Sequence, residues 1–132
     1  MQNGLYIVAT PIGNLGDLSP RAAETLANAD VIACEDTRIA KKLFALLNIS
    51  TVGKKFIVYQ NYNEEDEAQN IINLAVNDGK SIALVSDAGS PLISDPGYRL
   101  VRKAREQNVF VTVLPGCCAL VCALQLSGLP TN

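Results

Sequence analysis

Short apolar runs alternate with longer segments of helical spacing along the whole chain. Five runs are rich in β-branched and aliphatic residues and predict strands at 5–9, 31–34, 56–59, 81–85 and 109–114. Almost every position in these runs is apolar, which is typical of strands that are covered on both faces. The pattern therefore predicts a sheet that is buried inside the molecule.

Two helices are predicted in the first half of the chain. One begins at Ser19 and Pro20. Serine is a common N-cap, and proline suits the first helical position because the N–H there has no partner within the helix. The other spans 39–47, where three leucines recur at the spacing of a core-facing stripe, namely Leu43, Leu46 and Leu47. These leucines are expected to anchor that helix on the sheet.

Three more helices are predicted in the second half. The segment 63–77 is amphipathic and carries four acidic residues in its first turn, at 64–67, which the positive end of a helix dipole favours. Another helix runs from a cap at Asp95 and Pro96 to Gln107, and an apolar helix covers 118–126. Strands and helices therefore alternate throughout the sequence.

This alternation predicts an α/β fold. Consecutive parallel strands need a crossover, which a helix supplies, and helices on both faces of the sheet account for the apolar strands. We expect a three-layer sandwich with a five-stranded, mostly parallel sheet in the middle. A length of 132 residues is near the commonest size of one domain, so 1–132 is interpreted as a single α/β domain.

Ligands of such sheets bind beyond the carboxyl ends of the strands. Three of these ends are rich in glycine and proline, at 10–17, 86–97 and 115–119. Glycine lets a ligand approach the backbone, and proline fixes the shape of a loop in advance. Every βα loop needs turn residues, but three such loops at one edge favour a ligand site. The sequence contains neither the dinucleotide fingerprint nor the P-loop motif.

Composition narrows the chemistry further. Hydrophobic residues make up 48% of the chain, which excludes a disordered tail, and no apolar run is long enough to span a membrane. The net charge of -2 argues against a dedicated polyanion binder. There is no histidine, which removes the usual general base, and the four cysteines fit no zinc spacing. We therefore expect no metal and a cytoplasmic protein with reduced thiols.

Five segments resemble those of the tetrapyrrole methylase superfamily. They are LYIVATPIGNLGD at 5–17, CEDTR at 34–38, ALVSDAGSPLISDPG at 83–97, LPG at 114–116 and SGLPT at 127–131. The sequence is most similar to the branch of small-subunit ribosomal RNA (cytidine-2'-O)-methyltransferases. The resemblance covers essentially the whole chain.

This resemblance implies an S-adenosylmethionine (SAM)-dependent enzyme that methylates the ribose 2'-hydroxyl of a cytidine in 16S ribosomal RNA, within the small ribosomal subunit. Members of the superfamily hold SAM between two α/β domains and usually act as homodimers. Residues 1–132 would then form the N-terminal half, with the C-terminal domain absent from this chain, and we expect the chain to be folded but inactive alone. Two alternatives stay open: a non-catalytic dimerisation or RNA-binding module of the same fold, and a methyltransferase for a small tetrapyrrole precursor.

The resemblance also implies the residues that contact SAM. The loop after the fourth strand is similar to the main cofactor loop of the family, and the loop after the fifth strand is similar to a second wall. The expected contacts are Asp87, Ala88, Gly89, Ser90, Pro91, Gly116, Cys117 and Cys118. The cysteine pair replaces the family's more usual proline or alanine followed by serine, but cysteine is small enough to line a pocket.

A ribose hydroxyl is a poor nucleophile until a base takes its proton. Without histidine, the candidate catalytic carboxylates are Asp17, Glu35 and Asp36. Asp87 could also act as the base, although binding the amine or ribose of SAM is its favoured role. For Glu35 and Asp36 the alternative is a solvated turn or a cap of the following helix.

Two groups of basic residues are candidates for RNA contact. Arg38, Lys41 and Lys42 share one helical face by their spacing, and such a patch can neutralise phosphates. The alternative for this patch is an ordinary solvated helix face. That second interpretation is favoured for the other group, on the helix after the long loop, which comprises Arg99, Arg102, Lys103 and Arg105.

Overall fold

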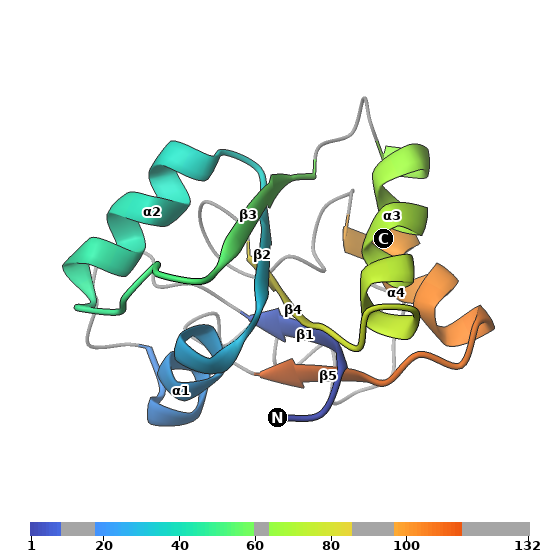
Figure 1. Ribbon diagram of the computed structural model, residues 1–132, viewed down its shortest axis with the longest axis horizontal. Helices are drawn as coiled ribbons and strands as arrows, with labels where there is room; N and C mark the ends of the chain where they lie inside the picture. The colour runs from blue at the N-terminus through green and yellow to red at the C-terminus, as the bar shows by residue number, and fades with distance from the viewer. Residues whose placement is uncertain (9–17, 60–63, 86–96, 115–132) are drawn as a thin grey trace, which may run out of the picture.

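The computed structural model describes residues 1–8, 18–59, 64–85 and 97–114 (Figure 1). The strands are β1 (Gly4–Val8), β2 (Val31–Cys34), β3 (Lys55–Val58), β4 (Ser81–Val85) and β5 (Val111–Leu114). The helices are α1 (Pro20–Asn28), α2 (Thr37–Leu46), α3 (Glu64–Val76) and α4 (Gly97–Glu106). None of these helices is long and apolar enough to cross a membrane.

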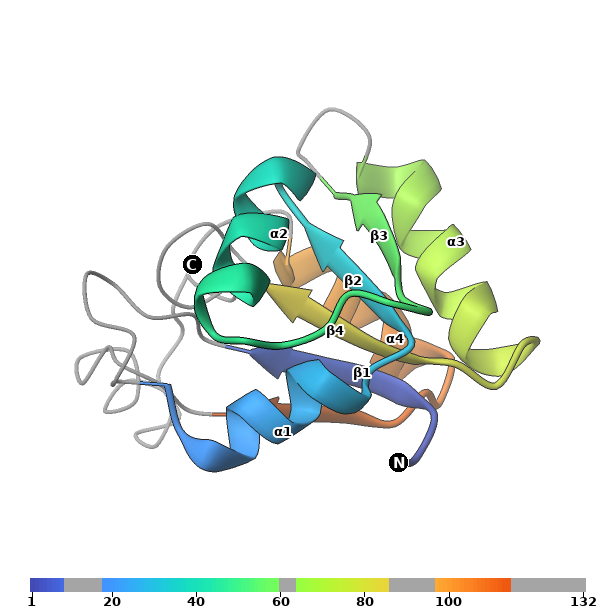
Figure 2. The same cartoon turned by 60° about the vertical axis from the view of Figure 1, so that its left-hand side comes forward.

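The five strands form one sheet in the order β3-β2-β4-β1-β5, and all four neighbouring pairs are parallel. The connections through α1 and α2 move toward β3, whereas those through α3 and α4 move toward β5. Because such crossovers are right-handed, the two pairs of helices must cover opposite faces of the sheet. Figure 2 shows α1 and α2 on one side of the strands and α3 and α4 on the other. The predicted three-layer α/β sandwich is therefore confirmed.

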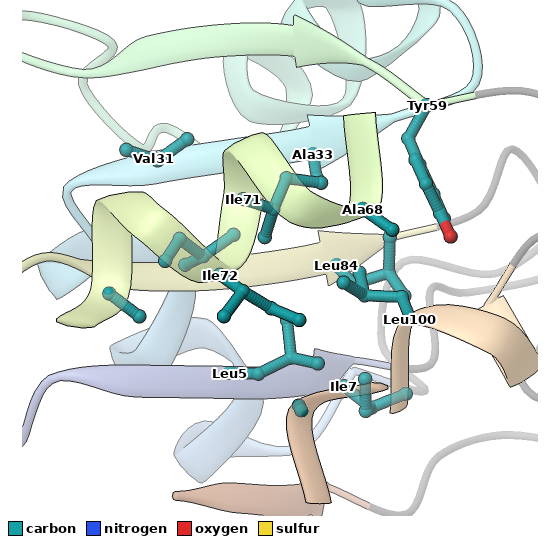
Figure 3. Close-up of a cluster of buried hydrophobic side chains, with 13 residues drawn as sticks. Leu5, Ile7, Val31, Ala33, Tyr59, Ala68, Ile71, Ile72, Leu84 and Leu100 are labelled. Atoms are coloured by element: carbon teal, nitrogen blue, oxygen red, sulfur yellow. The ribbon is translucent and has the colours of Figure 1, made fainter. Parts of the chain in front are cut away.

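Each face of the sheet carries its own hydrophobic cluster, because successive strand residues point to opposite sides. Leu5 and Ile7 of β1 belong to the cluster under α3 and α4, which Figure 3 shows. Val8 belongs to the cluster under α1 and α2. In that cluster the rings of Phe44 and Phe56 pack edge to face, with their centres 5.3 Å apart. The central strands β1, β2 and β4 are buried at every position, as the apolar runs predicted.

Helix α1 begins as predicted, and both of its ends are satisfied by side chains. The Ser19 hydroxyl accepts a hydrogen bond from the Ala22 N–H at 3.1 Å, and Pro20 occupies the first turn. At the other end the Lys54 ammonium donates to the carbonyl oxygens of Ala27 and Ala29, at 2.6 and 2.7 Å. These bonds satisfy two carbonyl groups that a helix end leaves without partners.

The predicted core stripe of the second helix is wrong in part. Leu46 is 58% exposed, Leu43 and Leu47 are half-buried, and the residues that α2 buries are Ala40 and Phe44. The helix also begins two residues earlier than predicted, at Thr37. The earlier start agrees with the position of Asp36, which caps the helix.

The other boundaries differ from the prediction by one or two residues. Strand β1 begins at Gly4, β3 spans Lys55–Val58 rather than 56–59, and α3 is one residue shorter at each end than 63–77. Pairing of β5 starts at Val111 rather than at 109. The predicted cap at 95–96 and the predicted helix at 118–126 lie outside the described residues.

Candidate functional site

Three strand ends lie side by side at the carboxyl edge of the sheet. Val8, the last residue of β1, pairs in register with Val85 of β4 on one side and with Leu114 of β5 on the other. Neighbouring strands are about 4.8 Å apart, so the three chains leave the sheet within about 10 Å of one another. The three loops rich in glycine and proline therefore start from one compact place on the sheet.

Most of the predicted site residues belong to those loops and lie outside the described residues. This holds for Asp17, for Asp87, Ala88, Gly89, Ser90 and Pro91, and for Gly116, Cys117 and Cys118. Their assignments to SAM or to proton removal stay predictions. The structure defines the strand ends from which their segments start, and these ends are adjacent.

The carboxyl end of β2 leads to Glu35 and Asp36. Asp36 is the N-cap of α2, where its carboxylate accepts from the Arg38 N–H at 2.9 Å. This hydrogen bond, helped by the Arg38 guanidinium 3.5 Å from the carboxylate, holds the pKa of Asp36 below its ordinary value. The capping alternative is thus confirmed for Asp36, and a carboxylate with a lowered pKa is a weaker base. Glu35 is half-buried beside it.

The three basic residues of α2 lie together on its solvent side, and we refer to them as the α2 basic patch: Arg38, Lys41 and Lys42. All three are exposed, and the Arg38 side chain is 91% accessible. The Lys41 ammonium lies 5.4 Å from the centre of the Phe56 ring, a cation–π contact that restrains it. Because α2 follows the end of β2, the patch begins at the same edge of the sheet as the loops.

The basic residues of α4 lie on the other face of the sheet. Arg99, Arg102 and Arg105 are exposed, and Lys103 is half-buried. The Arg102 guanidinium forms an ion pair of 3.3 Å with Glu106, one helical turn away. This arrangement agrees with the interpretation of α4 as a solvated helix face.

The sequence predicted a strand that ends at Tyr59 but did not indicate that this side chain is buried at the carboxyl edge. Its side chain is only 1% exposed, although the residue lies just beyond the end of β3. The only signal in the sequence was a tyrosine at the end of an apolar run. Cys34 also ends its strand there, with a buried thiol that donates to the Ile57 carbonyl at 3.5 Å.

Two hollows in the described part of the molecule lie away from this edge. One, of about 380 Å³, is lined by Ile57 of β3 and Leu74 of α3 together with amide and charged side chains. The other, of about 620 Å³, lies near the amino ends of the strands beside Asn3, Arg105 and Phe110. Neither hollow includes a residue predicted to bind SAM or RNA.

Comparison with known proteins gives a match over nearly the whole chain. The family model for tetrapyrrole (corrin/porphyrin) methylases matches residues 4–132. The chain is 54% identical over 128 residues to ribosomal RNA small subunit methyltransferase I of Vibrio cholerae, covering 97% of this chain and 43% of that protein. It is 48% identical over 132 residues to the protein of the same name from Rickettsia prowazekii, covering 100% and 46%. The chain thus spans less than half the length of these two relatives.

Solved structures share the same architecture. Uroporphyrin-III-C-methyltransferase from Thermus thermophilus superposes with a TM-score of 0.68 at 23% identity, over 98% of this chain and 55% of that one. A cobalt precorrin-4 methyltransferase of cobalamin biosynthesis gives a TM-score of 0.71 at 18% identity, over 93% and 49%. At these identities the likeness concerns the fold alone.

Proposed function

The chain belongs to the tetrapyrrole methylase family, and from that premise we propose that it is the SAM-binding part of a methyltransferase that acts on small-subunit ribosomal RNA. The observation that carries the proposal is the 54% and 48% identity to relatives named for this activity. The structures of tetrapyrrole methyltransferases are only 23% and 18% identical, which gives no comparable support for a tetrapyrrole substrate. The proposed reaction is methyl transfer to the ribose 2'-hydroxyl of a cytidine in 16S RNA.

The proposed cofactor position is the carboxyl edge of the sheet. The register of Val8 with Val85 and Leu114 supports it, because the segments containing Asp87–Pro91 and Gly116–Cys118 both start there. When bound, SAM supplies an electrophilic methyl group on a sulfonium. In this proposal the Asp87 carboxylate binds the amine or ribose of the cofactor, while the glycines allow close approach of the backbone.

The protein's main contribution to such a transfer is alignment of the donor with the hydroxyl, which can supply up to roughly 7–11 kcal/mol in ideal cases. A carboxylate near the hydroxyl would accept its proton, and we keep Asp17, Glu35 and Asp36 in that role. Among them Asp36 is the least suited, because its carboxylate already caps α2 and has a lowered pKa. Asp17 and Glu35 are therefore preferred.

The RNA is proposed to approach across the α2 basic patch. The patch starts at the same edge as the three loops and presents Arg38, Lys41 and Lys42 to solvent. Its partner would be 16S RNA within the small ribosomal subunit, in the cytoplasm. A homodimer, usual in the family, is part of the same proposal.

The methylation pattern of the small-subunit RNA tests the function. The reading frame that encodes the chain would be deleted, and 16S RNA from the strain would be digested and analysed by mass spectrometry. The proposal predicts the loss of one 2'-O-methylcytidine, restored by the intact frame but not by one carrying Asp87→Ala. Restoration by Asp78→Ala, an exposed carboxylate after α3, serves as the control. An unchanged methylation pattern in the deletion strain would contradict the proposal.

A further inference from the structure

Tyr59 connects the carboxyl ends of two neighbouring strands through its backbone. It immediately follows β3, and its N–H donates to the carbonyl of Cys34, the last residue of β2, at 2.8 Å. The hydrogen bonding between β2 and β3 therefore extends one residue beyond β3. Tyr59 is fixed at the point where the chain leaves the sheet.

The side chain of Tyr59 is buried in an aliphatic environment. It is among the largest fully buried side chains, and its cluster contains Leu84 of β4, Leu100 of α4 and Ala68 of α3. Within the described residues of this cluster, Tyr59 alone brings a polar side-chain atom. Figure 3 shows the hydroxyl on the side where the arrowheads of β2 and β4 end.

A buried phenol takes a hydrogen-bond partner, and aliphatic side chains cannot provide one. Figure 3 places the hydroxyl at the carboxyl edge, so we expect its partner among the polar groups there. The ring packs in the cluster with Leu84, one residue before the end of β4. The backbone meanwhile is bonded to the end of β2.

We infer that Tyr59 is a positioning residue of the carboxyl edge: it fixes the end of β4 relative to the end of β2. This inference rests on the proposed function, because β4 leads to the predicted SAM contacts at Asp87–Pro91 and β2 leads to Glu35. Strands β2 and β4 pair directly as far as Ala33 and Leu84, and Tyr59 packs in the cluster beside the end of that pairing. In this inference, removal of the Tyr59 hydroxyl lowers the affinity for SAM by more than the loss of a buried hydroxyl elsewhere in the sheet.

The test compares Tyr59→Phe with Tyr6→Phe. Tyr6 is the matched control, because its side chain is also buried and its hydroxyl donates to the Gln2 carbonyl at 2.6 Å, at the opposite end of the sheet. SAM dissociation constants would be measured by calorimetry, and urea midpoints would show that both variants fold. For Tyr59→Phe we expect a dissociation constant raised roughly five- to tenfold, as for one hydrogen bond, and for Tyr6→Phe a change below about twofold. Equal effects of the two variants, or none, would overturn the inference.

Amide hydrogen exchange of the chain without SAM separates this inference from the proposed function. Tyr59→Phe is expected to speed exchange at Leu84 and Val85, at the end of β4, whereas Tyr6→Phe leaves these amides unchanged. If the wild-type chain alone does not bind SAM, the cofactor site needs more than this chain, and exchange alone decides the positioning role. Unchanged exchange at the end of β4 in Tyr59→Phe would overturn that role.

Discussion

Replacing Gly4 by alanine tests how closely the amino ends of β1 and β5 approach each other. Gly4 has a φ of +146°, and a Cβ added there would lie 2.6 Å from the Phe110 carbonyl oxygen and 2.9 Å from the Phe110 Cβ. The same carbonyl accepts the Leu5 N–H at 2.8 Å. The backbone of Phe110 therefore cannot move away without weakening the link between the two strands.

Two costs add up in Gly4→Ala. A side chain at this φ is strained by about 1–3 kcal/mol. Forcing a methyl group against fixed backbone atoms adds about 1–3 kcal/mol. The free energy of unfolding is thus expected to fall by roughly 2–6 kcal/mol, a large share of the roughly 5–15 kcal/mol that is typical of a domain.

Urea unfolding monitored by circular dichroism measures this loss, with Gly53→Ala as the matched control. Gly53 also has a positive φ, of +79°, but a Cβ there would meet nothing within 4 Å. The control is expected to lose only about 1 kcal/mol, from the strain of the positive φ. The reasoning would be refuted if the two losses agreed within about 0.5 kcal/mol, because the close approach to Phe110 would then cost nothing.

Three further predictions concern the core, the response to acid and the RNA surface. Phe44→Ala removes a fully buried ring and should lower the free energy of unfolding by about 3–5 kcal/mol, measured by urea denaturation. The Ser81 N–H donates to the Asp30 carboxylate and lowers its pKa. The stability that this carboxylate contributes is therefore present above its ordinary pKa of 3.8 and is lost as pH falls through the lower pKa of the folded state. Urea midpoints measured below pH 4 should show this loss. Replacing all three residues of the α2 basic patch by glutamine should weaken binding to small ribosomal subunits and reduce its salt slope by about 0.7–0.9 for each phosphate that the patch no longer neutralises, measured by filter binding over a salt series.

Each of these predictions has its own control. Leu46→Ala changes a side chain that is 58% exposed and should shift stability by no more than about 0.5 kcal/mol; an effect as large as that of Phe44→Ala would contradict the assignment of the core face. Asp30→Asn should flatten the acid dependence, and an unaltered dependence would contradict the role of the pair with Ser81. Arg102→Gln removes one charge from α4, on the other face, and should leave the salt slope unchanged. A fall as large as that for the α2 basic patch would place the RNA elsewhere.

The sequence alone was sufficient to predict the alternation of strands and helices and the edge at which the loops meet. The apolar runs at 31–34 and 81–85 match β2 and β4 residue for residue. A strand that is covered on both faces is apolar along its whole length, so the run itself marks where the strand begins and ends. The start of α1 was equally clear, since Ser19 and Pro20 act through local chemistry. Local signals of this kind need no knowledge of the rest of the fold.

Tertiary contacts decided the features that the sequence did not reveal. The leucine spacing in 39–47 favoured Leu46 as a core residue, but the Phe44 ring packs against Phe56 of the following strand, and that contact selects the buried face. The start of β5 was placed too early, because the Val109 N–H closes the end of α4 by donating to the Ala104 carbonyl at 2.9 Å. The left-handed Asn108 between them turns the chain before pairing can begin.

The candidate site at the carboxyl edge could also be predicted from the sequence only in part. The sequence placed three loops at one edge, and the register of Val8 with Val85 and Leu114 agrees with that placement. The contribution of Tyr59 depends on a side chain that crosses from the end of β3 to the region of β4, which no spacing along the chain indicates. For Asp36 the sequence left a base and a helix cap both open, and the structure shows the cap of α2.

Calorimetric titration of the chain with SAM tests the central claim most directly, namely that the ends of β1, β4 and β5 support a cofactor site. We predict saturable binding that is abolished by Asp87→Ala and retained by Asp78→Ala, because only the former residue belongs to the loop that leaves β4. Binding by the Asp87→Ala variant that equals binding by the wild-type chain would contradict the assignment of the cofactor to this edge.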